Sequence, residues 1–66
     1  MRHYLFEEML SGEEFIVGAD CIGEAGLIAE GIAQDIGKEY NDGAWELQFY
    51  DELTDEEAEM SGLDEY

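Results

Sequence analysis

A chain of 66 residues has room for one domain, residues 1–66, and lies near the size at which a single hydrophobic core is only just sufficient. Its 19 acidic and two basic residues give a formal net charge of -17, which excludes nucleic acid and anionic membranes as direct ligands. A content of 45% hydrophobic and 12% aromatic residues excludes a disordered acidic tail and indicates a folded protein.

The single cysteine and the apolar pattern bear on the cellular compartment. Cys21 has no second cysteine with which to form an internal disulfide, whereas a secreted domain of this size usually carries several. The chain has no basic segment followed by the apolar region of a signal peptide, and no apolar run approaches ~18 residues. We therefore expect a cytoplasmic protein.

The first elements in chain order are two predicted strands. Residues 3–10 are rich in apolar and aromatic side chains, Ser11-Gly12 favours a turn, and residues 15–19 have the composition of a second strand. The short connection predicts a β-hairpin. Both faces of the first strand carry apolar residues, so the register is ambiguous. In the favoured register, four side chains face the core: Tyr4, Phe6, Phe15 and Val17.

A helix of about 16 residues is predicted next, because apolar residues recur at spacings of three and four. Asp20 has the chemistry of an N-cap, Gly37 is expected to end the helix, and Lys38 suits the negative end of its dipole. Close packing of helix on sheet would account for glycines within the pattern. The residues of the apolar face are Ile22, Ala25, Ala29, Ile32 and Ile36, and the interior glycines are Gly23, Gly26 and Gly31.

The last two predicted elements are a strand and a short helix. A turn at residues 41–43 leads into residues 44–50, where apolar and polar side chains alternate. Thr54 and Glu57 have the spacing of a capping box, so a short helix should run to about residue 61, before Gly62. The side chains expected to pack on the sheet from this region are Leu53, Ala58, Met60 and Leu63.

These elements predict an α+β fold. A right-handed crossover from the second strand to the third places the third strand beside the first, which gives a three-stranded antiparallel sheet of order 2-1-3. The long helix then covers one face, and the short helix follows at the C-terminal end.

No pattern in the chain indicates catalysis, a cofactor or a metal site. His3 is the only histidine and is interpreted as a partly exposed strand residue, and Cys21 as a small half-buried one. There is no phosphate-binding loop, G-x-G-x-x-G, H-E-x-x-H or calcium-binding loop pattern. We therefore predict a protein that is not an enzyme, with no cofactor. Clustered carboxylates should bind cations only weakly and diffusely, and a protein with a dedicated cation site is a distant alternative.

The acidic residues concentrate in two segments. Four lie around the first turn and eight lie in the last 16 residues, whereas the predicted long helix has three before its end. Tyrosines accompany these acids. A tyrosine can stack on an arginine of a partner while neighbouring carboxylates form ion pairs with the same arginine. A solvated face that maintains solubility is the alternative. The predicted partner-binding residues are Glu7, Glu8, Glu13, Glu14, Tyr50, Asp51, Glu52, Asp55, Glu56, Glu57 and Glu59.

The amount of charge suggests imitation of DNA. A compact domain of this length has a diameter of roughly 28 Å, and B-DNA of that length carries ~16 charges. The chain resembles the small acidic DNA-mimic proteins of phages and mobile elements, most of all the anti-CRISPR proteins, in size, charge and element order. No specific motif carries this resemblance, so no residue role is transferred.

The resemblance implies a cytoplasmic, non-catalytic inhibitor that fills a nucleic-acid-binding site of another protein, such as a Cas effector subunit that reads DNA. Like-charge repulsion favours a monomer. Two alternatives from other classes stay open: an acidic adaptor that binds a basic protein without a nucleic-acid function, and an ordinary small domain of a halophile.

Overall fold

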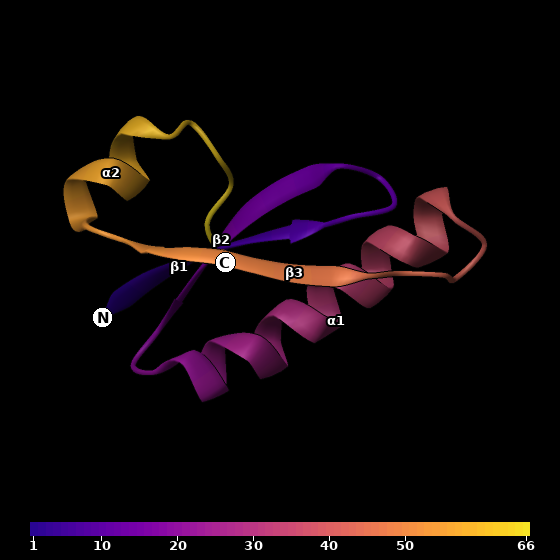
Figure 1. The fold of residues 1–66 in the computed structure, drawn as a ribbon, viewed down its shortest axis with the longest axis horizontal. Coiled ribbons are helices and arrows are strands. Elements are labelled where there is room, and N and C mark those ends of the chain that lie inside the picture. Colours follow the sequence, from indigo (N-terminus) through magenta and orange to yellow (C-terminus); the bar gives the residue numbers. More distant parts are fainter.

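The computed structural model describes all 66 residues. The elements are β1 (Arg2–Glu8), β2 (Glu13–Ala19), α1 (Ile22–Tyr40), β3 (Leu47–Leu53) and α2 (Asp55–Met60). The strands form one antiparallel sheet of order β2-β1-β3, so the predicted α+β fold and strand order are confirmed. α1 lies along one face of the sheet and α2 lies on the other side (Figure 1). We call the face that packs on α1 the inner face and the opposite one the outer face.

The core lies between the inner face and α1. The hairpin register pairs Tyr4 with Val17 and Phe6 with Phe15, and all four side chains are buried as predicted. α1 meets them mainly with small side chains, which allow a helix to approach a sheet closely. The buried residues of α1 are Ala25, Ala29, Ala33, Ile36 and Gly37. Ile22, predicted on this face, is instead 48% exposed.

Both predicted ends of the long helix are wrong. Cys21, not Asp20, is the N-cap residue, and its side chain makes no capping hydrogen bond. Gly37 does not end the helix, which continues to Tyr40, where the Asn41 N–H closes it on the Gly37 carbonyl oxygen. The backbone reversal comes later, with Asp42 and Gly43 at positive φ. Cys21 is also exposed rather than half-buried.

Close packing explains Gly37 of α1, and not the interior glycines for which it was predicted. A Cβ at Gly37 would collide with the carbonyl oxygen of Ala44, because the loop after the helix crosses its backbone there. A Cβ at Gly26 or Gly31 would have no neighbour within 4 Å. The prediction that the interior glycines fit the helix against the sheet is therefore wrong, and the structure offers no packing reason for them.

β3 begins and ends later than predicted. Trp45 lies before the strand, which runs from Leu47 to Leu53. The register against β1 shifts between Leu5 and Phe6, so Tyr50 has no partner of its own in the ladder. Such a bulge redirects side chains and increases local twist. The Phe49 ring lies on the inner face, against the rings of Tyr4 and Phe6.

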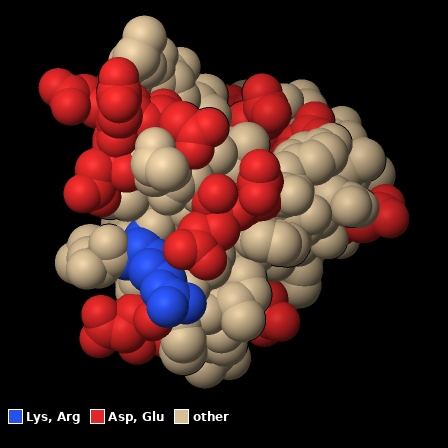
Figure 2. All heavy atoms as spheres, turned by 60° about the vertical axis from the view of Figure 1, so that its left-hand side comes forward, with Lys and Arg blue, Asp and Glu red and all other residues tan.

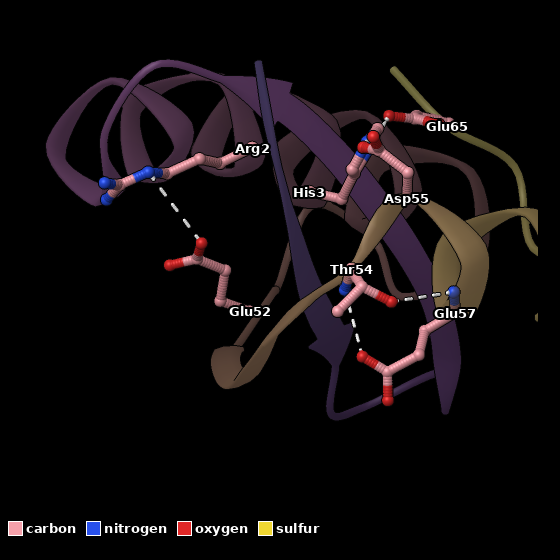
Figure 3. Close-up of polar contacts among 7 residues, drawn as sticks. All are labelled: Arg2, His3, Glu52, Thr54, Asp55, Glu57 and Glu65. Carbon is pink, nitrogen blue, oxygen red and sulfur yellow. Dashed lines mark hydrogen bonds and ion pairs between the residues drawn. The ribbon is translucent and has the colours of Figure 1, made fainter.

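The C-terminal region follows the predicted capping box. The Thr54 hydroxyl accepts the Glu57 N–H at 3.1 Å, and the Glu57 carboxylate accepts the Thr54 N–H at 2.9 Å (Figure 3). The tail after Gly62 then runs beside β2, where Ile16 and Glu65 form a parallel bridge. Of the side chains expected to pack on the sheet, Ala58 is buried, Leu53 and Leu63 are half-buried, and Met60 is 78% exposed.

Candidate acidic interface

Glu8 is the one predicted partner-binding residue that the structure buries completely. Its exposed fraction is 0%, and its carboxylate accepts the backbone N–H groups of Leu10 at 3.1 Å, Ser11 at 2.8 Å and Glu46 at 2.8 Å. Burial disfavours the charged form, but the N–H donors outweigh it and hold the pKa of Glu8 below its ordinary value. Glu8 ties the hairpin turn to the start of β3 and is not available to a partner.

Three acids of the hairpin remain and form the first acidic group: Glu7 and Glu14 on the outer face, and Glu13, which pairs with the buried Glu8. Glu7 and Glu14 are direct cross-strand partners, and this pairing of like charges is unfavourable in a sheet. The Tyr50 hydroxyl donates a hydrogen bond to the Glu7 carboxylate, which raises the pKa of Tyr50. Glu13 and Glu14 are exposed, and Glu7 is half-buried. The predicted placement of Tyr50 on the face away from α1 agrees with this contact.

The second acidic group lies at the opposite end of the sheet, on the last residues of β3 and on α2. Asp51 pairs with Leu5 in the ladder, and Leu5 lies on the outer face. Glu56 and Glu59 project from α2 without an ion-pair partner. All the members of this group are exposed: Asp51, Glu52, Asp55, Glu56, Glu57 and Glu59.

Only part of this negative charge is neutralised within the chain. The Arg2 Nε lies 3.8 Å from the Glu52 carboxylate, with both side chains largely exposed (Figure 3). Such an exposed surface pair contributes little to stability, because solvent screens it. Figure 2 shows this end of the molecule, where acidic side chains surround the only basic group in view.

His3 makes a three-way contact that the sequence did not reveal. Its Nε2 lies 2.6 Å from Asp55, its Nδ1 contacts Glu65, and the imidazole side chain is only 16% exposed (Figure 3). The hydrogen bonds to Glu65 and Asp55 raise the pKa of His3 above its ordinary value, so they favour the imidazolium. His3 therefore joins β1, the first turn of α2 and the C-terminal tail.

The sequence contained a local signal for the role of Glu8 but none for the role of His3. A carboxylate directly before a glycine turn is a recognisable candidate for accepting turn N–H groups, so Glu8 had a local signal. The partners of His3 are 52 and 62 residues away, and no local pattern indicates them. The two acidic groups themselves were predicted from local density alone, and the structure holds both on helices, strands or tight turns.

The molecule shows no surface pocket, and no group of three or more His, Cys, Asp or Glu side chains is arranged to hold a metal ion. No helix has the length and apolar character needed to span a bilayer. The chain matches no protein-family model, no curated protein and no solved structure.

Proposed function

We propose that this protein is a non-catalytic inhibitor whose acidic surface imitates DNA and blocks the nucleic-acid-binding site of a basic protein, a DNA-reading Cas effector subunit being the target we favour. The protein would act in the host cytoplasm as a monomer. The observation that carries the proposal is the position of two acidic groups, on the β1–β2 hairpin and on β3 with α2, at opposite ends of the sheet.

The dimensions support this proposal. The molecule measures 35 × 23 × 16 Å, and its two acidic groups lie toward the two ends of the long axis (Figure 1). B-DNA carries about one charge per 1.7 Å, so a duplex as long as this axis holds ~20 charges. The formal charge of -17 is of the same order. Nine of the 19 acidic residues lie in the two groups once the buried Glu8 is left out, and a cationic groove that follows a duplex would meet these carboxylates.

Retention of unfavourable charge is a second line of support. The adjacent carboxylates of Glu7 and Glu14 lower the stability of the hairpin, and two cationic side chains cannot compensate for 19 acidic ones. A protein of this size has little stability to lose. Use of the charge in binding explains why the sequence keeps it.

The test is affinity capture from a host-cell lysate with the immobilised protein, at ~50 mM and ~500 mM salt, two concentrations at which screening differs strongly. We expect basic nucleic-acid-binding proteins to be enriched at low salt and lost at high salt. Duplex DNA should displace them. If DNA leaves the captured protein bound, an adaptor role replaces mimicry; if no nucleic-acid-binding protein is enriched, the proposal fails.

Two matched triple variants separate placement of charge from its amount. The first, Glu14→Gln with Glu56→Gln and Glu59→Gln, changes the two acidic groups. The control changes three exposed acids of α1 instead: Glu24→Gln, Glu30→Gln and Asp35→Asn. Each removes three carboxylates, so the formal charge becomes -14 in both. We expect the first variant to weaken capture by at least about tenfold and the control by much less. Equal loss would show that position does not matter.

A further inference from the structure

The two edges of the sheet are treated differently by the fold. Residues 64–66 run along the edge of β2. The Ile16 N–H donates to the backbone carbonyl oxygen of Asp64 at 2.9 Å, and the Tyr66 N–H donates to the backbone carbonyl oxygen of Ile16 at 2.7 Å. At the other edge of the sheet, β3 pairs with β1 alone. No backbone hydrogen bond joins the free edge of β3 to another segment. The chain thus covers one edge itself and leaves a seven-residue strand open.

The ladder identifies the free backbone groups of that strand. The Met9 N–H donates to the Glu46 oxygen at 2.7 Å, so the Glu46 carbonyl points toward β1. Backbone groups of successive residues alternate in direction in an antiparallel pair, and those of Leu47 and Phe49 therefore point away from β1. Beyond the bulge, the Glu52 N–H already bonds the Asp51 carboxylate at 2.8 Å. The open donors and acceptors are those of Leu47 and Phe49.

The side chains along this edge determine which strand it suits. Phe49 is 44% exposed and Tyr50 is 48% exposed, and they offer apolar surface beside the free backbone. Asp51 and Glu52 are exposed next to them; Glu52 forms a surface pair with Arg2, and Asp51 has no cationic partner. Acidic residues at an edge oppose pairing with a second copy, which brings the same charges, and they favour a strand of opposite charge.

We propose that β3 takes up an extended basic segment of the partner as a fourth strand, with backbone hydrogen bonds to Leu47 and Phe49 and with Lys or Arg side chains near Asp51 and Glu52. Addition of a strand to an open sheet edge is a common mode of peptide recognition, in which backbone bonds supply affinity and side chains supply specificity. The inference rests on the proposed function for the basic character of the partner, and it specifies how that partner binds.

The experiment titrates isotope-labelled protein with a capped nonapeptide of alternating lysine and threonine. A control peptide of the same sequence carries N-methyl groups on five successive central amides, which keep its charge and remove the N–H donors from both edges of the strand. We expect the first peptide to shift the amide signals of Leu47 and Phe49, to slow their hydrogen exchange at least about tenfold, and to bind at least about tenfold more tightly than the control. Asp51→Asn with Glu52→Gln should weaken it more than Glu24→Gln with Glu30→Gln.

Equal binding of the two peptides, or signal shifts spread over both acidic groups without protection of Leu47 and Phe49, would overturn the inference, because charge alone would then explain binding. Concentration-dependent protection of the same amides without peptide would overturn it too, since a second copy would occupy the edge. These readouts do not involve DNA. Failure here leaves displacement by duplex DNA, the test of the proposed function, as a separate result.

Discussion

The Glu8→Gln substitution tests the difference between a surface acid and a buried structural one. In the native protein, Oε2 of Glu8 accepts the N–H groups of Leu10 and Glu46, and Oε1 accepts that of Ser11. Glutamine has one carbonyl oxygen, so at least one of these N–H groups would face an NH2 group without an acceptor. The substitution removes an interaction with a charged acceptor and leaves a buried donor unsatisfied.

The magnitude follows from these contacts. A hydrogen bond to a charged group contributes about 1.5–3 kcal/mol, and an unsatisfied buried donor costs about 1–3 kcal/mol. Since burial of the carboxylate already offsets part of this, we expect a loss of about 2–4 kcal/mol at pH 7. Total stabilities of about 0.05–0.15 kcal/mol per residue correspond to roughly 3–10 kcal/mol for a chain of this length. Glu8→Gln should therefore bring the protein close to unfolding.

The pH dependence gives a second readout. Because folding lowers the pKa of Glu8, its contribution is present above the pKa of the unfolded chain and is lost as pH falls through the lower pKa of the folded state. The difference in unfolding free energy between wild type and Glu8→Gln should be largest near pH 7 and shrink in acid.

Urea unfolding followed by circular dichroism at several pH values measures both effects. Glu13→Gln is the matched control, because Glu13 is the exposed cross-strand partner of Glu8. It should change the unfolding free energy by no more than about 0.5 kcal/mol. If the two variants had the same stability at pH 7, our account of Glu8 as the ligand of the turn would be refuted.

Three further predictions use other contacts. His3→Gln should lower the melting temperature at acidic pH, and the two proteins should converge as pH rises through the raised pKa of folded His3, because the imidazolium contact is then lost; melting curves over a pH series measure this, and a constant difference would contradict it. Gly37→Ala should cost about 1–3 kcal/mol through collision with the following loop, whereas the control Gly31→Ala should gain up to about 1 kcal/mol; urea unfolding would disprove the packing argument if the two agreed. Thr54→Ala should cost about 1 kcal/mol and speed amide exchange in α2, and unchanged exchange there would count against the capping box.

Local patterns in the sequence predicted much of the fold. Alternation and a short glycine turn predicted the hairpin and its inward residues Tyr4 and Phe6, and the spacing of Thr54 and Glu57 predicted the cap of α2. These features depend on interactions between residues a few positions apart, or on the two-residue period of a strand. The strand order then followed from the handedness of crossovers.

The errors arose where distant segments decide the local structure. Glycine commonly ends helices, but Gly37 lies inside α1, where the loop at Ala44 packs against it. Residues 44–46 alternate like a strand, yet the pairing begins at Leu47, where the Glu8 carboxylate holds the Glu46 N–H. Propensity is a weak prior, and tertiary contacts of this kind override it.

The amino-acid sequence alone determined the charge of the protein, the order and type of its elements and the two segments in which acids gather, because composition, periodicity and capping are properties of neighbouring residues. Only the tertiary structure decided which acids serve the fold and which face solvent, since burial and hydrogen bonding join positions far apart in the chain. Glu8 and Glu7 are adjacent glutamates with opposite environments, one inside a turn and one on the outer face. The open edge of β3 also belongs to the tertiary structure, because an edge exists only when strands have been placed side by side.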